Sequence, residues 1–181
     1  MKKLVIAAFA AAFAVAANAA AVAWFQVDPT VNGSDGAVVA DGLTAYLINA
    51  SYADTSFVAT WASGGIDAAL AAAGDNVVDN LGYTAEGMVL ADEAASYGTA
   101  ALNAYYVIVG DDEIFISGTQ AAVVDTLDPS NSTIEFTSLS STVVDAGSYA
   151  GGAAWVNVPE PTSGLLLLLG VAGLALRRRR A

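Results

Sequence analysis

The stretch NAYYVIVGDDEIFIS, residues 103–117, decides the fold class that this sequence predicts. Residues 103–109 and 114–117 are rich in aromatic and β-branched side chains, which are typical of strands. Residues 110–113 have the sequence Gly-Asp-Asp-Glu, and these residue types favour a turn. The stretch therefore predicts two antiparallel strands joined by a tight connection, a β-hairpin.

Further strands are predicted where short apolar or alternating segments are bounded by Gly, Pro, Asn or Asp. These segments are residues 21–27, 43–49, 56–61, 133–137 and 155–158. The segment 56–61 follows 43–49 at hairpin distance, and the turn-rich loop VNGSDG, residues 31–36, precedes both. Short strands at this spacing predict a mainly β fold, a β-sandwich of Greek-key or Ig-like type.

One short helix is predicted within these strands, at residues 66–73. Ile66, Leu70 and Ala73 share one face, Asp67 lies in the first turn, and Gly74 ends the helix. A second helical turn is expected around residues 92–97. The complete prediction adds an N-terminal signal helix and a C-terminal hydrophobic helix to the sandwich.

The N-terminus, MKKLVIAAFAAAFAVAANAA, has the three-part layout of a secretory signal peptide. A basic start at Lys2 and Lys3 precedes an apolar stretch, and Ala17 and Ala19 supply the small residues that signal peptidase requires. We expect cleavage after Ala19, so that residues 1–19 are removed during export.

The C-terminus, VPEPTSGLLLLLGVAGLALRRRRA, combines a Pro-Glu-Pro motif, an apolar run and an arginine cluster. Residues 164–176 are fewer than the ~20 that a stable transmembrane helix needs, so we expect them to enter the membrane only transiently. The arginines would remain on the cytoplasmic side. The motif residues are Val158, Pro159, Glu160 and Pro161, and the arginines are Arg177, Arg178, Arg179 and Arg180.

These three elements, in this order and at the chain end, resemble the PEP-CTERM sorting signal of Gram-negative bacteria. The resemblance covers residues 158–181 only. It implies recognition by an exosortase, an integral-membrane cysteine transpeptidase, with cleavage near the motif and transfer to the cell envelope, outer surface or extracellular matrix. Proteins with this signal are typical of bacteria that make exopolysaccharide. The expected organisation is a signal peptide (1–19), an exported domain (20–157) and a sorting signal (158–181).

The segment that remains after processing carries no basic side chain. Between Leu4 and Leu176 there is no Lys or Arg, and the whole chain lacks His and Cys. Of the 18 acids only Glu160 lies outside residues 20–158, so the side chains of this segment carry a charge of −17. Such a surface argues against nucleic acid and anionic lipid as partners, because both are bound through cations. The lack of His, Cys and Lys between Leu4 and Leu176 also argues against catalytic triads, thiolate sites, Schiff-base lysines and P-loops.

Carboxylates and oxygen ligands are the chemistry that remains. An acid pair could serve a glycoside hydrolase, but the sequence offers no means of choosing two acids, and we expect no enzyme. Calcium is the cofactor that oxygen ligands could hold, although none of the acidic loops follows the EF-hand pattern. The candidates are the turn Asp111, Asp112 and Glu113, the loop Asp28, Asn32 and Asp35, and the loop Asp125, Asp128 and Asn131.

Aromatic side chains could form a platform for sugars, although on alternating strands they more often belong to a core. The candidates are Trp24, Trp61 and Trp155, with Tyr46, Tyr52, Tyr83, Tyr97, Tyr105, Tyr106 and Tyr149. Sequons at Asn32, Asn49 and Asn131 are compatible with a glycosylated matrix protein. We expect a non-enzymatic structural or interaction protein of the envelope or matrix, associated with exopolysaccharide. The alternative is a carbohydrate-binding module that uses exposed aromatics and calcium.

Overall fold

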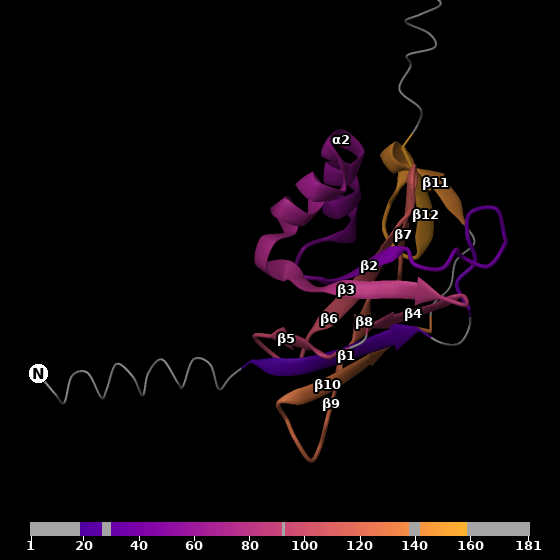
Figure 1. Ribbon diagram of the computed structural model, residues 1–181. Coiled ribbons are helices and arrows are strands. Elements are labelled where there is room, and N and C mark those ends of the chain that lie inside the picture. Colours follow the sequence, from indigo (N-terminus) through magenta and orange to yellow (C-terminus); the bar gives the residue numbers. More distant parts are fainter. Residues whose placement is uncertain (1–18, 27–29, 92, 138–141, 159–181) are drawn as a thin grey trace, which may run out of the picture.

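The described part of the chain forms one curled sheet with a helix on its outer side (Figure 1). The computed structural model describes residues 19–26, 30–91, 93–137 and 142–158. The mainly β prediction is confirmed, since these residues form a 12-stranded sheet and the helix α2, Asp54–Ala73. The predicted signal helix and C-terminal hydrophobic helix lie outside the described residues.

The sheet begins at the residue that follows the predicted signal cleavage point and ends directly before the predicted sorting motif. Along its main path the order is β11-β12-β7-β6-β2-β3-β4-β1-β10-β9, while β5 pairs with β1 and β8 pairs with β6. Most neighbours are antiparallel, but β1 pairs with β10 in parallel, and so does β11 with β12. The strands are β1 (Ala20–Gln26), β2 (Thr44–Asn49), β3 (Val77–Ala85), β4 (Met88–Ala91), β5 (Ala95–Tyr97), β6 (Asn103–Val109), β7 (Glu113–Ile116), β8 (Gln120–Ala121), β9 (Val123–Val124), β10 (Asn131–Glu135), β11 (Val143–Asp145) and β12 (Ala154–Asn157).

The predicted hairpin is confirmed as β6 and β7, and it lies at the centre of the molecule. Its side chains are apolar on both faces, so both faces need a covering layer. Tyr106 and Ile108 of β6 point into an inner core, whereas Tyr105 and Val107 point into an outer core. The hairpin therefore separates the two cores of the domain.

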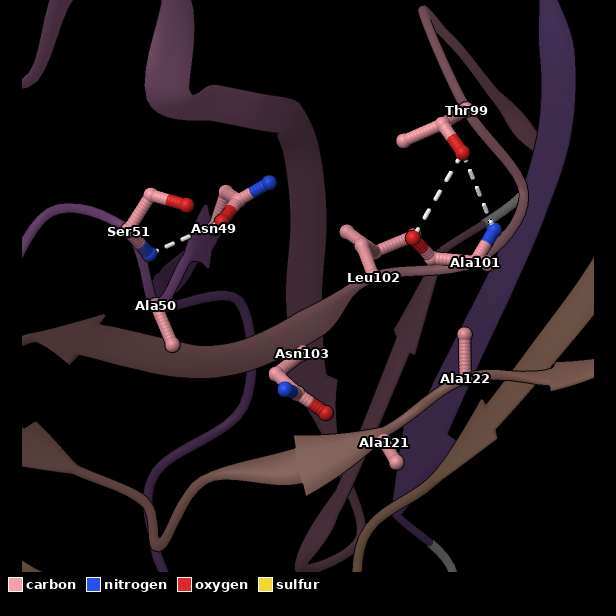
Figure 2. A pocket seen from close by; sticks show the side chains of 9 residues that line it. All are labelled: Asn49, Ala50, Ser51, Thr99, Ala101, Leu102, Asn103, Ala121 and Ala122. Atoms are coloured by element: carbon pink, nitrogen blue, oxygen red, sulfur yellow. Dashed lines mark hydrogen bonds between the residues drawn. The ribbon is translucent and has the colours of Figure 1, made fainter.

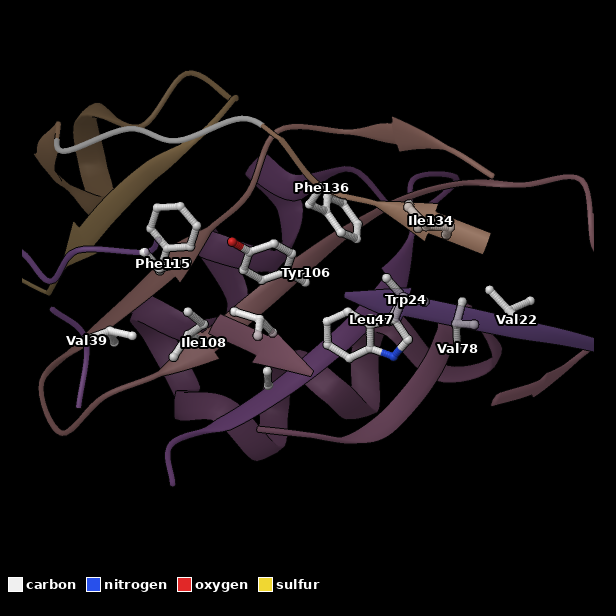
Figure 3. Packing of buried hydrophobic residues seen from close by; sticks show 14 of the residues in the cluster. Val22, Trp24, Val39, Leu47, Val78, Tyr106, Ile108, Phe115, Ile134 and Phe136 are labelled. Atoms are coloured by element: carbon white, nitrogen blue, oxygen red, sulfur yellow. The ribbon is translucent and has the colours of Figure 1, made fainter. Parts of the chain in front are cut away.

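The inner core lies inside the curl of the sheet, where strands that are distant in the sheet order face each other (Figure 3). The Tyr106 ring of β6 contacts Phe136, which follows β10, edge to face with ring centroids 4.8 Å apart. It also lies 6.0 Å from the Trp24 ring of β1. Two sides of one sheet thus pack face to face, as the layers of a sandwich do.

The segment 120–124 closes the curl. Its first part, β8, pairs with the start of β6, and its second part, β9, pairs with β10. The same short segment therefore bridges two strands from opposite sides of the inner core. Backbone hydrogen bonds consequently continue around the core at this end, which leaves less of the sheet edge unpaired.

The outer core lies between the sheet and α2. The helix buries Phe57, Val58, Trp61, Ala69 and Ala73 against β6, β7 and β12. Its backbone kinks at Gly65, whose φ of 78° lies in the left-handed region that favours glycine. Gly74 ends the helix as predicted, with its backbone N–H bonded to the Leu70 carbonyl.

Two predictions about local structure are wrong. Residues 56–61 were predicted as a strand but form the first half of α2, because their buried residues follow the helical spacing 57, 58 and 61. Of the residues 92–97, for which a helical turn was expected, Ala95–Tyr97 form strand β5 instead and pair with β1, while residue 92 lies outside the described residues. In both cases tertiary pairing or packing overrides a weak local preference.

Candidate functional site

The predicted sorting motif begins where β12 ends. Asn157, the last residue of β12, pairs with Glu113 of β7 and Asp145 of β11, so this end of the chain is anchored in the sheet. Val158 is half-buried and packs against the outer core. The first residue of the motif is thus part of the folded domain.

The other processing residues lie at or beyond the limits of the described chain. Pro159, Glu160, Pro161 and the cluster Arg177–Arg180 are outside it, as is Ala17. Ala19 is described, is exposed and directly precedes β1. Ala20, which cleavage after Ala19 would make the first residue, is already buried in the sheet.

A pocket of about 840 Å³ lies beside Asn157 and Val158, where the chain leaves the sheet, and we call it the exit pocket. The α2 kink, the β6–β7 turn and the end of β12 contribute its walls. Asp111 and Asp112 are exposed, and Glu113 Oε1 accepts a hydrogen bond from Ser34 Oγ at 2.9 Å. The residues that line the exit pocket are Trp61, Ala62, Ser63, Gly64, Gly65, Asp111, Asp112, Glu113, Asn157 and Val158.

The acidic candidates for calcium binding mostly cap their own turns. Asp35 accepts a hydrogen bond from Ala37 N, and Asp125 accepts one from Leu127 N. Asp128 accepts from the Ser130 backbone and hydroxyl and from the Asn131 amide, and the bonds from Ser130 lower its carboxyl pKa. Within the described residues no group of three or more acids is arranged to hold a metal ion. Asp28 lies outside them.

Asp54, the first residue of α2, binds the segment that leads into β12. Its Oδ2 atom accepts hydrogen bonds from Tyr149 OH at 2.9 Å and from Gly152 N at 3.0 Å. Burial raises the pKa of Tyr149, and the hydrogen bond and charge of Asp54 raise it further. Burial, with a smaller effect of the Asp54 charge, also raises the pKa of Tyr105, whose hydroxyl has no partner among the described residues. The Asp54 carboxylate therefore has a structural role, because it joins the start of α2 to the segment that leads into β12.

Most of the described aromatic side chains pack in or against the two cores. Trp24, Trp61 and Trp155 are all buried. Ring contacts join residues of the cores, such as Phe115 with Trp155 at 5.3 Å and Phe57 with Tyr105 at 6.4 Å. The seven tyrosines are buried or half-buried. A tryptophan platform for sugars is therefore absent from the part of the chain that the structure describes.

A second pocket, of about 680 Å³, opens where β2 ends and β6 begins, and we call it the amide pocket (Figure 2). Figure 2 shows Asn49, Ala50 and Ser51 on one side and Thr99, Ala101 and Ala122 on the other, with Leu102, Asn103 and Ala121 between them. None of its side chains is charged. Its lining residues are Asn49, Ala50, Ser51, Thr99, Ala101, Leu102, Asn103, Ala121 and Ala122.

The chain end that the exit pocket flanks is the part of the protein that can be related to known proteins. Residues 157–180 match the PEP-CTERM protein-sorting motif. The resemblance predicted from the sequence is confirmed, and it is confined to this C-terminal segment. The motif implies an exported protein of Gram-negative type that an exosortase recognises and that is processed at the membrane.

The other comparisons add no relative. No curated protein and no solved structure matches the chain. Among the described residues, no helix is both long enough and apolar enough to cross a membrane.

Neither pocket was predicted as a site from the sequence. The acidic turn was singled out for calcium, but nothing in the sequence places it beside the exit of the chain at Val158. The amide pocket had a weaker signal, the sequon at Asn49, which was interpreted as a possible glycosylation acceptor. In the structure the Asn49 amide Nδ2 donates to Tyr97 OH at 3.1 Å.

Proposed function

We propose that the mature protein is a non-enzymatic structural or interaction component of the cell envelope or extracellular matrix, and that it associates with exopolysaccharide. The observation that carries the proposal is the sorting motif, which directly follows the last strand of the sheet. Exosortase processing would thereby deliver the folded domain, with little or no spacer, to the outside of the cell.

The chemistry of the described side chains supports a role without catalysis. Nucleophile–base pairs that need Cys, His or Lys have no candidate residues between Leu4 and Leu176. The buried carboxylate Asp79 binds Trp24 Nε1, and the half-buried Asp54 binds Tyr149 and Gly152. Most of the remaining described acids are exposed. The carboxylates thus hold the fold together or keep its surface hydrated.

The composition and packing of the domain also suit an extracellular protein. The domain has no cysteine and hence no disulfide bond, so its two hydrophobic cores supply the stability. The negative surface opposes self-association and binding to other acidic polymers. Such a domain would remain folded and dispersed within a hydrated matrix.

The proposal is tested by changing the motif in the full chain and following where the protein goes. In a Gram-negative host with an exosortase, we expect the wild-type chain in the envelope or matrix fraction. A variant with Pro159→Ala, Glu160→Ala and Pro161→Ala should accumulate as unprocessed precursor, as should the wild type in a host without exosortase. Glu135→Ala, a change of an exposed glutamate on β10, serves as the matched control.

The matrix role is tested separately in the native host. Deleting the coding sequence should reduce the exopolysaccharide that is retained on the cells, and restoring the wild-type chain should recover it. The motif variant should fail to restore retention. Normal retention in the deletion strain would contradict the structural role, while an unchanged distribution of the motif variant would contradict sorting.

A further inference from the structure

The amide pocket has the features of a built binding site. Backbone hydrogen bonds connect the segments that line it: Ala50 N donates to Asn103 O at 2.8 Å, and Ala122 N donates to Leu102 O at 2.8 Å. Asn103 also pairs with Ala121 through the β6–β8 ladder. Because strand pairing fixes these walls, a ligand would pay little entropy to order them.

The polar groups of the pocket are neutral, and two of them are free to bind a ligand. Asn49 is held in place, since its Oδ1 accepts from Ser51 N at 2.8 Å and its Nδ2 donates to Tyr97 OH. Asn103 and Ser51 are both exposed, and the Asn103 amide and the Ser51 hydroxyl have no hydrogen-bond partner among the described residues. Together they offer both donors and acceptors at one rim of the pocket.

The remainder of the lining is apolar. Leu102 is buried as part of the inner core, and the alanines at positions 50, 101, 121 and 122 complete the apolar lining. A sugar ring has the same division, because it presents C–H groups on its faces and hydroxyl groups around its edge. The volume of about 680 Å³ lies within the usual range for small-molecule sites.

The charge of the protein and of the pocket lining favours an uncharged glycan over a charged one. The segment 20–158 has a side-chain charge of −17 and no Lys or Arg that could pair with a uronate or a sulfate. The pocket itself has no carboxylate that could pair with an amino sugar. Its amides and hydroxyls match the vicinal hydroxyl groups of an uncharged chain.

We propose that the amide pocket binds a neutral oligosaccharide segment, with Asn103 as a direct ligand and the apolar part of the lining against the sugar ring. This inference rests on the proposed association with exopolysaccharide and names the class of polymer, a neutral one. The proposed sugar contact uses a pocket without aromatic lining residues, whereas the sequence suggested a platform of exposed aromatic side chains.

The test uses the exported protein on an array of neutral hexose oligomers, N-acetylhexosamine oligomers and uronate oligomers, followed by calorimetric titration of the strongest neutral binder. We expect a Kd below about 1 mM for at least one neutral oligomer and none for the uronates. Asn103→Ala and Asn103→Asp should weaken binding about tenfold or more. Asn80→Ala and Asn80→Asp, at an exposed position of β3, are matched controls and should bind as wild type.

Several outcomes would overturn the proposal: no neutral oligomer binds, only uronates bind, or the Asn103 and Asn80 variants have the same affinity. Thermal unfolding of each variant checks that the fold is retained. Envelope sorting of the Asn103 variants should be normal. Sorting without glycan binding would therefore refute only this site, whereas binding by a protein that is not sorted would refute the proposed function.

Discussion

Trp24 Nε1 donates a hydrogen bond to Asp79 Oδ2 across 2.6 Å inside the protein. The two residues are 55 positions apart in the chain and lie on β1 and β3, which flank β4 in the sheet. The other oxygen of Asp79 accepts from Leu81 N at 2.9 Å. One buried carboxylate therefore satisfies a side chain of the inner core and the backbone of its own strand.

Replacing this carboxylate should destabilise the fold. Asp79→Ala leaves the buried Trp24 N–H without an acceptor, and an unsatisfied buried donor costs about 1–3 kcal/mol. We expect the free energy of unfolding in urea to fall by about 2 kcal/mol. Asn80→Ala, at the exposed neighbouring position, should change it by less than about 0.5 kcal/mol. Equal stabilities of the two variants would refute the role of Asp79.

Gly82 is the position where the inner core has least room. A Cβ atom placed there would lie 2.3 Å from Trp24 Cζ2 and 2.8 Å from the Ala45 carbonyl oxygen. We expect Gly82→Ala to lower the free energy of unfolding by about 1–3 kcal/mol, because the ring must move within a packed core. Gly98→Ala, where a Cβ meets nothing within 4 Å, is the control and should melt near the wild-type temperature. A wild-type melting temperature for Gly82→Ala would contradict this packing.

Two of the hairpins, β6–β7 and β3–β4, differ in how well the sequence predicts them. The β6–β7 hairpin was predicted because residues 103–109 and 114–117 are dense in β-formers around an acidic turn. The β3–β4 hairpin was missed, because its turn is Glu86-Gly87 rather than a common Asn-Gly pair. Both residues have positive φ, 52° and 77°, and Asp41 Oδ1 accepts the Glu86 N–H at 2.6 Å. A contact 45 residues away thus supports a turn that local preference does not indicate.

The helix and the amide pocket show the limits of local patterns more strongly. Residues 56–61 have strand-like composition, but Phe57, Val58 and Trp61 can all reach the outer core only from a helix. The amide pocket needs β2, β6 and β8 to meet, and such pairing between distant segments cannot be derived from composition. By contrast, the sorting motif could be recognised from the sequence because its residues are contiguous, and the predicted range 158–181 overlaps the matched residues 157–180.

Stability should decline above pH 10. Burial raises the pKa values of Tyr105, Tyr106 and Tyr149 in the folded protein, whereas in the unfolded chain a phenol ionises near 10.0. The stabilisation is therefore complete below pH 10 and is lost as the pH rises, by up to about 1.4 kcal/mol per pH unit for each fully buried tyrosine. Urea unfolding between pH 8 and pH 11 measures this slope.

Tyr105→Phe isolates one of these phenols. Its hydroxyl has no hydrogen-bond partner in the part of the chain that the structure describes, so the variant should lose no stability at pH 7 and should have a shallower slope above pH 10. Tyr149→Phe provides the contrast, because it loses the hydrogen bond to Asp54 and should be less stable at pH 7. An alkaline slope of Tyr105→Phe equal to that of wild type would contradict the buried phenol.

Salt should stabilise the mature protein. Its acids have no Lys or Arg partners, and their mutual repulsion is screened as the Debye length falls from about 30 Å at 0.01 M to about 8 Å at 0.15 M salt. We expect the melting temperature to rise with NaCl over this range. The double variant Asp111→Asn and Asp112→Asn should be more stable than wild type at low salt and close to it at high salt. A melting temperature that is independent of salt would argue against charge repulsion.

The central claim is that this chain is exported, sorted through its C-terminal motif and left without a cationic side chain. The intact mass of the exported protein tests it most directly, measured before and after trypsin treatment in urea. We predict a chain that begins near Ala20, ends near Pro159–Pro161 and does not change in mass with trypsin, because it contains no Lys or Arg. An exported mature protein that retains Arg177–Arg180, and that trypsin shortens at its C-terminus, would contradict the account.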